Sequence, residues 1–442
     1  MQNDKTTLKD LSIYTADASG GIFSLIDRTT SQVGRDHLKR HIAQPPATAS
    51  HLVKLQDAVK FWQANVVLWP KVISNGTIIM LEKFFESADH VSAPPTGVTL
   101  MMGAMLQRLL NRQEYFLTRF SLSHLSDFLK GCRELADIAE RPDVPELLKS
   151  ELDNINKELE HRLVERMMAV NNETKYADLA QLNYLARREM KSMIYRLIAS
   201  YARLDAWQAM ARATTEHNWV FPEILPESPI QFEMEQLYHP LVTTPVAYDI
   251  QFDNSRNFLV ITGANMSGKT TFMRSLGVGA LMAHLGMGVP AKALRISFLH
   301  GIITNMHVED NILKGESYFF AEVQRIKQTA ERICQDKPHL VLMDELFKGT
   351  NVHDAYECTK AVMDGLLNHN HHLMILSTHL YEVAHKFQDH KEILFAYFVT
   401  EMEHDDYKFT YELKPGISND RIGYRILQQE GVISLLQNKA KQ

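Results

Sequence analysis

The sequence predicts an α-helical first half followed by an α/β second half, and three observations support this division. From about residue 50 to residue 217, apolar residues recur at the spacing of amphipathic helices. Between Trp219 and Pro245, prolines recur among short strand-like pieces, which marks a boundary. After this boundary, all-apolar runs such as Leu340–Met343 are typical of parallel strands that are covered on both faces.

The composition is that of an ordinary globular protein. The 442 residues are 45% hydrophobic and 23% charged with a net charge of −6, so no global basic surface for nucleic acid is expected. Cys132, Cys334 and Cys358 lack metal-ligand spacing and fit a reducing compartment. The polar N-terminus lacks a signal-peptide pattern, and the apolar run Val98–Leu106 is too short to span a bilayer. We therefore expect a soluble, cytoplasmic protein with no membrane segment.

The first half divides into helical segments by its periodicity. After a short amphipathic lead-in over residues 1–48, helices are predicted over residues 52–64, 78–88, 100–120, 122–138, 146–170 and 178–215. The break at 171–178 is short, so the last two segments are expected to form an antiparallel pair of long helices. We predict a helical domain over residues 1–217, a boundary segment over 218–245 and an α/β domain over 246–442.

The second half contains apolar strand patterns that alternate with helical ones. Strands are predicted at Phe258–Ile261, Leu340–Met343 and Met374–Leu376. Near the end, Ile393–Glu403 and Tyr407–Leu413 flank two aspartates, which predicts a C-terminal β-hairpin.

The first of these strands runs directly into the pattern Gly-x-x-x-x-Gly-Lys-Thr, and a helical pattern follows from Phe272. This strand–loop–helix context is the one that a phosphate-binding P-loop needs. The glycines let backbone N–H groups face a phosphate chain, a lysine supplies a charge between the β- and γ-phosphates, and a threonine hydroxyl can ligate Mg²⁺. The predicted ATP-binding residues are Gly263, Ala264, Asn265, Met266, Ser267, Gly268, Lys269, Thr270 and Thr271.

Two acids follow the strand Leu340–Met343. Asp344 is expected to join Thr270 in the shell of Mg²⁺, and Glu345 to polarise the attacking water. A kinase would place its base near a bound acceptor, whereas this acidic pair suits hydrolysis by water. Lys269 and Glu345 are thus candidate catalytic residues.

Two further residues are candidates for contacts with the γ-phosphate. His379 ends the next apolar strand, and a neutral histidine there can hydrogen-bond the γ-phosphate or the attacking water. Ser317 is placed to cap the N-terminus of a helix, which is also an anion site. On the local pattern alone, a plain helix cap is the favoured interpretation of Ser317. The other histidines, including His369, His371 and His372, are interpreted as solvated surface residues.

Together these motifs resemble the MutS family of ATPases, which belongs to the ABC class of DNA-maintenance proteins. The family pattern T-G-x-N-M-x-G-K-[ST]-T stands here as Thr262–Thr271, and its Asn-Met pair separates it from other P-loops. Leu342–Glu345 with Lys348–Asn351, then Ser377–His379 and Leu413–Gly416, are similar to later motifs of the family. The resemblance implies a helical core and lever region followed by an ABC-type P-loop ATPase domain. It also implies a dimer with two composite ATP sites, in which Ser317 reaches the γ-phosphate of the partner subunit.

The chain also departs from the family pattern. Full-length members begin with a mismatch-binding domain and a connector domain, whereas this chain starts in the helical core, so it resembles a truncated member. The break at residues 171–178 is too short for the DNA clamp that normally interrupts the long helices. The family's usual Gly, Arg, Gly and Thr are replaced by Phe347, Asn305, His307 and Tyr318.

The last long helix offers a candidate local DNA-binding face. Its basic residues outnumber Glu189 and Asp205, and phosphate contacts by them would give salt-dependent binding without sequence preference. The alternative is a solvated helix face. The candidate DNA contacts are Arg187, Arg188, Lys191, Arg196, Arg203 and Arg212.

The sequence therefore predicts a MutS-like, ATP-dependent DNA-binding protein. The expected activity is Mg²⁺-dependent ATP hydrolysis at a homodimer interface, coupled to movement of helical arms on DNA, in DNA mismatch repair or related DNA maintenance. One alternative is an ATP-gated protein scaffold that binds neither DNA nor mismatches directly. A second alternative, a P-loop kinase or transporter ATPase, is disfavoured by Asp344-Glu345 and by the absence of a Leu-Ser-Gly-Gly-Gln stretch.

Overall fold

The structure, a computed structural model, describes residues 3–15, 20–86, 112–306, 318–335, 337–403, 406–418, 428 and 430–438. The chain divides into two compact units. The helical unit comprises residues 26–41 and 54–215, and the α/β unit comprises residues 1–25, 42–53 and 216–442. The helical domain expected over residues 1–217 differs from this division, because two N-terminal segments group with the second half.

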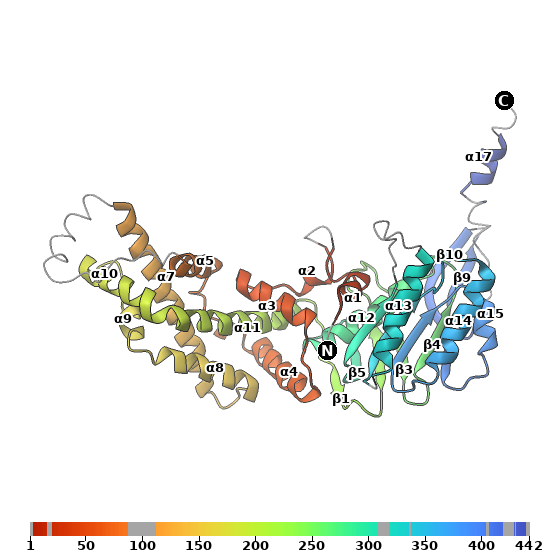
Figure 1. Cartoon of the computed structure of the whole chain (residues 1–442), viewed down its shortest axis with the longest axis horizontal. Coiled ribbons are helices and arrows are strands. Elements are labelled where there is room, and N and C mark those ends of the chain that lie inside the picture. The colour runs from red at the N-terminus through yellow and green to blue at the C-terminus, as the bar shows by residue number, and fades with distance from the viewer. Residues whose placement is uncertain are drawn as a thin grey trace. The chain divides into compact units, whose positions relative to one another are not determined.

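Helices make up most of the described first half of the chain (Figure 1). Their bounds are α1 Lys5–Asp10, α2 Ile22–Ile26, α3 Gln32–Ala43, α4 Ala49–Ala64, α5 Asn75–Glu86, α7 Arg112–Asp137, α8 Glu146–Leu159, α9 Val164–Met168, α10 Tyr176–Leu185 and α11 Lys191–Glu216. Short 3-10 turns lie at Val66–Leu68 and Ile138–Glu140, and a π-helical turn at Ala186–Met190 joins α10 to α11.

Two predicted helix boundaries are wrong. The segments expected over 100–120 and 122–138 are one helix from Arg112 onward, because neither Gly nor Pro stands at their junction and Ser121 is buried on the apolar face of the helix. Residues 100–111 lie outside the described part of the chain. The helix expected over 146–170 breaks after Leu159, where the His161 ring accepts the backbone N–H of Leu163 at 3.3 Å and competes with helical pairing.

The larger sheet of the α/β unit positions the candidate site (Figure 1). Among the described residues its strands lie in the order β10-β9-β4-β8-β7-β6, parallel except for β10, which is antiparallel to β9. Every residue of β4, β7 and β8 is buried, as expected for strands with both faces covered. The bounds are β4 Phe258–Thr262, β6 Gly301–Asn305, β7 His339–Asp344, β8 Leu373–Ser377, β9 Ile393–Glu403 and β10 Asp406–Pro415.

Helices cover both faces of this sheet. On one face, β4, β7 and β8 form a core cluster with Ile333, Met363 and Val383 from three helices. On the other face α12 packs so closely that a Cβ on Gly277 would lie 3.0 Å from the side chain of Leu342. These helices are α12 Lys269–His284, α13 Tyr318–Ile333, α14 Val352–Leu366 and α15 Tyr381–Lys386, and a last helix, α17, spans Val432–Asn438.

A smaller sheet has the order β1-β5-β2-β3. Its strands are β1 Glu223–Leu225, β2 Phe232–Leu237, β3 Tyr248–Phe252 and β5 Ala293–Ser297. Residues 218–245, which the sequence marks as a boundary segment, thus supply β1 and β2. Among the described residues, no helix has the length and apolarity needed to cross a membrane.

The N-terminal helix α1 packs against β6. The Thr304 hydroxyl donates to the Asp10 carboxylate at 2.7 Å, and the Thr7 hydroxyl lies 3.4 Å from the Ile302 carbonyl oxygen. On α13, Arg325 and Arg332 pair with Asp4 at 3.3 and 3.2 Å. These contacts explain why the first residues of the chain belong to the α/β unit.

Candidate functional site

The candidate site lies at the carboxyl ends of three neighbouring parallel strands. In the register of the sheet, Ser377 at the end of β8 is opposite Ile261 of β4 on one side and Asp344 of β7 on the other. The residues that follow these strands therefore meet at one edge of the sheet, where ligands bind in open α/β sheets.

The loop after β4 adopts a backbone that few residues tolerate. Gly263 and Gly268 have φ values of +139° and +110°. A Cβ on Gly268 would also lie 3.2 Å from the Tyr411 ring. Met266, with φ 69°, projects outward and is 75% exposed. Helix α12 begins at the next residue after Gly268, so its N-terminus faces the loop.

Lys269 is buried within this loop. Its ammonium donates to the carbonyl oxygens of Gly263 at 2.8 Å and Ala264 at 2.9 Å, and it pairs with Glu345 at 3.3 Å. The Ser267 hydroxyl is buried beside it without a hydrogen-bond partner. An incoming anion would find both a positive charge and an unused donor here.

Thr270 and Asp344 are joined directly. The Thr270 hydroxyl donates to Asp344 Oδ2 at 2.7 Å, and the Ser377 hydroxyl donates to Asp344 Oδ1. A hydroxyl and a carboxylate are the oxygen ligands that Mg²⁺ takes from proteins when phosphates and water complete its shell. The donor set therefore fits a magnesium–phosphate ligand.

Glu345 lies among three basic side chains. Besides Lys269, its carboxylate pairs with Lys348 at 3.2 Å and lies 3.7 Å from His379 Nδ1. Burial by itself raises the pKa of Glu345, but the charges of Lys269, Lys348 and His379 outweigh burial and hold this pKa below its ordinary value. The group is therefore an anion at neutral pH, as a residue that orients water must be.

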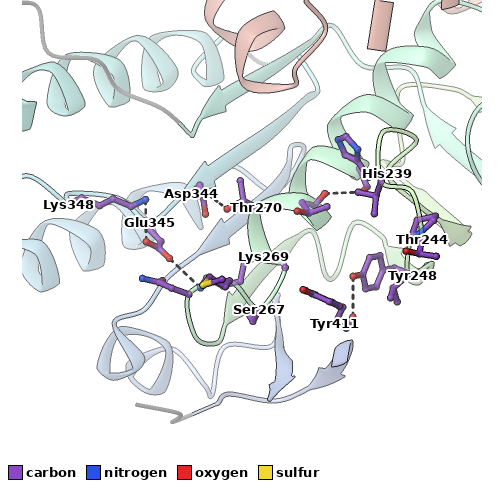
Figure 2. A pocket seen from close by; sticks show the side chains of 18 residues that line it. His239, Thr244, Tyr248, Ser267, Lys269, Thr270, Asp344, Glu345, Lys348 and Tyr411 are labelled. Carbon is purple, nitrogen blue, oxygen red and sulfur yellow. Dashed lines mark hydrogen bonds and ion pairs between the residues drawn. The ribbon is translucent and has the colours of Figure 1, made fainter. Parts of the chain in front are cut away.

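These side chains line a cavity of about 670 Å³ (Figure 2). From the predicted set it is lined by Asn265, Met266, Ser267, Gly268, Lys269, Thr270, Thr271, Asp344 and Glu345. Gly263 and Ala264 adjoin the cavity, because their carbonyl oxygens accept hydrogen bonds from Lys269, which lines it. His379 lies 3.7 Å from Glu345, which also lines it. Ser317 lies outside the described residues.

Sequence reasoning missed the opposite wall of the cavity. It is formed by His239, Thr244 and Tyr248 together with Tyr411, whose carbonyl oxygen accepts the Tyr248 hydroxyl at 3.1 Å. Burial lowers the pKa of His239 to about 4 and raises that of Tyr248 to about 12, so both rings are neutral. The segment around His239 had the composition of a linker, and no local pattern connected it with the loop after β4.

The basic residues of the long helix are largely engaged within the helical unit. Arg187 donates to the Phe84 carbonyl oxygen at 2.7 Å and lies 4.0 Å from the centre of the Phe84 ring. Arg196 makes two bonds to Glu158, at 2.6 and 2.8 Å, and Arg203 pairs with Glu151. Arg188 donates to the Tyr184 hydroxyl, and Arg212 donates to the Arg28 carbonyl oxygen. Lys191 is partly exposed. Three of the six expected DNA contacts, Arg187, Arg196 and Arg203, therefore contact another helix of the unit.

The interpretation of the histidines as surface residues is wrong for several of them. His372 is fully buried, accepts the backbone N–H of His339 at 3.1 Å, and its other ring nitrogen lies 3.1 Å from the Ile333 carbonyl oxygen. His284 is also fully buried between Ala280 and Leu299. Among the described residues, no group of three or more His, Cys, Asp or Glu side chains could hold a metal ion.

Comparison with known proteins places the site in a protein family. Residues 259–442 match the family model of MutS domain V. Over 278 residues, 60% of this chain, the sequence is 29% identical to the DNA mismatch repair protein msh3 of Aspergillus oryzae. Over 274 residues, 59% of this chain, it is 31% identical to the DNA mismatch repair protein msh3 of Emericella nidulans. The matched parts cover 25% and 24% of these relatives, so the chain spans about a quarter of their length.

Proposed function

We propose that this chain, whose residues 259–442 match MutS domain V, is a MutS-family, Mg²⁺-dependent ATPase with a role in DNA mismatch repair or related DNA maintenance. The observation that carries the proposal is the 2.7 Å bond between Thr270 and Asp344, directly beside Lys269 and Glu345. It joins a hydroxyl and a carboxylate at the base of a cavity whose size suits a nucleotide.

The loop would bind the phosphate chain. Backbone amides between Gly263 and Gly268 and the N-terminus of α12 attract anions, and Ser267 has a hydroxyl to donate. Lys269 would exchange its contacts with the loop carbonyls and Glu345 for the β- and γ-phosphates. Magnesium, when bound to Thr270 and Asp344, would offset the phosphate charge in the transition state.

Glu345 would act on water. Its carboxylate is anionic, and loss of Lys269 to the phosphates frees one of its oxygens to accept a hydrogen bond from the attacking water. His379, whose Nδ1 lies 3.7 Å from Glu345, would sense the γ-phosphate. We further propose a homodimer in which Ser317 completes the site of the partner subunit and in which ATP turnover moves the helical arms.

Substitution of the proposed base tests the chemistry. In Glu345→Gln the side chain keeps its shape but loses the negative charge, so ATP binding should persist while turnover falls by about a hundredfold or more. Steady-state phosphate release and equilibrium binding of ATP measure the two effects. Glu357→Gln, on the surface of α14, is the matched control and should turn over normally. A normal turnover rate in Glu345→Gln would show that another group orients the water.

A second candidate function is an ATP-gated protein scaffold without DNA binding. It is favoured by one observation, the engagement of Arg187, Arg196 and Arg203 in contacts within the helical unit. Under the DNA-binding proposal, the exposed Arg188 and the partly exposed Lys191 would supply phosphate contacts.

Titration with homoduplex, mismatched and branched DNA at low and high salt distinguishes the two functions. DNA binding should weaken steeply with salt, and Arg188→Ala/Lys191→Ala should reduce the log–log salt slope by about two. Lys149→Ala, exposed on α8, is the control for loss of a charge. Absence of salt-sensitive binding to all three DNAs would leave the scaffold function.

A further inference from the structure

The turn between β7 and α14 carries Glu345 and has an unfavourable backbone. Glu345 and Phe347 have φ values of +52° and +61°, a region that side chains with a Cβ rarely adopt. Two such residues within three positions persist only where the surrounding structure holds them. The question is therefore which contacts hold this turn.

A buried carboxylate on α13 supplies those contacts. Glu322 is 6% exposed, and its two oxygens accept the backbone N–H groups of Lys348 and Gly349, each at 3.3 Å. Burial raises the pKa of Glu322, and the amides of Gly349, Lys348 and Phe347 partly offset this rise. One side chain thus holds consecutive amides of the turn.

The turn also packs closely against the start of α13. A Cβ on Gly349 would lie 2.6 Å from the Tyr318 ring and 2.9 Å from the backbone nitrogen of Phe319. The buried ring of Phe347 packs against Phe319, with ring centroids 5.9 Å apart. The first turn of α13 and the turn after β7 are therefore clamped together, with Glu322 at the centre of the contact.

We propose that Glu322 is a positioning residue for the ATPase site: through the amides of Lys348 and Gly349 it sets the turn that aims Glu345 into the cavity. The inference rests on the proposed ATPase function and deepens it. Glu322 does not line the nucleotide cavity, so it acts on the reaction through Glu345 and Lys348. Because Glu322 lies on α13, the position of this helix would determine where the Glu345 carboxylate points.

The first test separates turnover from binding. Glu322→Ala should lower kcat by about tenfold or more, because a loosened turn misplaces Glu345, while KM and ATP affinity stay within about twofold. The conservative variant Glu322→Gln keeps one acceptor oxygen and the volume of the side chain, so it should lose less. Glu331→Ala, exposed on the same helix, is the control and should match the wild type.

The second test uses a double-mutant cycle with Glu345→Gln, read as the single-turnover rate. If Glu322 acts through Glu345, adding Glu322→Ala to Glu345→Gln should change the residual rate by less than about twofold. An equal loss in both backgrounds, or a wild-type kcat in Glu322→Ala, would overturn the inference. If Glu322→Ala does not fold, the same cycle is run with Glu322→Gln, and the same two outcomes decide. Absence of ATP hydrolysis by the wild-type protein would instead refute the proposed function itself.

Discussion

At the scale of single residues, the loop after β4 depends on glycine at defined positions. Gly268 is the residue from which α12 starts, and its φ of +110° is accessible to glycine and strained for every L-residue with a Cβ. Its neighbour Lys269 is buried and held by carbonyl oxygens of the same loop. The conformation of one residue thus decides where the phosphate-binding charge lies.

Gly268→Ala should therefore harm both stability and nucleotide binding. The strained φ and the 3.2 Å approach of the new Cβ to Tyr411 are expected to cost about 1–3 kcal/mol and to weaken ATP binding. Gly365→Ala is the control, because no atom lies within 4 Å of its Cβ position and it sits in α14. That control should raise stability by up to about 1 kcal/mol. Thermal unfolding and ATP titration of both variants measure the contrast.

At the scale of elements, the helical unit is joined by polar contacts that its periodicity does not reveal. Asp205 of α11 is fully buried and accepts the backbone N–H groups of Thr30 and Ser31, both at 2.9 Å, and the Ser31 hydroxyl at 2.7 Å. It thereby caps the start of α3 from another helix. A Cβ on Gly34 would lie 2.1 Å from the same carboxylate, so glycine permits the approach.

Removal of this cap should destabilise the helical unit. Asp205→Ala leaves several buried donors without an acceptor, for an expected loss of about 3 kcal/mol in the free energy of unfolding. Asp153→Ala, exposed on α8, should stay within about 0.5 kcal/mol of the wild type. Thermal unfolding followed by far-UV circular dichroism measures both. Equal stabilities for the two variants would argue that the contact with Thr30 and Ser31 contributes little.

At the scale of the whole molecule, buried neutral histidines make stability depend on pH. Burial lowers the pKa of His284 and of His339 to about 4, and burial together with the neighbouring histidines lowers that of His372 to about 3. Above pH 6.5 these groups are neutral in both the folded and the unfolded states and contribute nothing. Below pH 6.5 the unfolded chain binds protons that the folded chain does not, so stability falls until the folded pKa values are reached.

The midpoint of thermal unfolding should accordingly decrease between pH 6.5 and about 4. Each such histidine can contribute up to roughly 1.4 kcal/mol per pH unit over this interval. The variant His284→Gln keeps a hydrogen-bond donor and an acceptor but cannot bind this proton. The slope, which is the decrease of unfolding free energy per pH unit, should therefore be smaller by the contribution of one histidine. His353→Gln, exposed on α14, should leave the slope unchanged. An unchanged slope in His284→Gln would mean that His284 is already protonated in the folded protein.

The sequence by itself determined the elements whose signal is local. The apolar runs predicted β4, β7 and β8, and the contiguous residues Gly263–Thr271 identified the candidate phosphate-binding loop. Asp344 and Glu345 could be predicted because they directly follow an apolar strand, and parallel strands of one sheet end at the same edge.

The tertiary structure alone decided the contacts between segments that are distant in sequence. It placed α1 against β6, His239 and Tyr411 on the far wall of the cavity, and Glu322 beneath the turn that carries Glu345. It also engaged Arg187 with Phe84, where sequence had suggested a DNA contact. The physical reason is that periodicity records which face of an element is apolar. The partner that a polar side chain meets is set by strand register and helix packing, which no local pattern records.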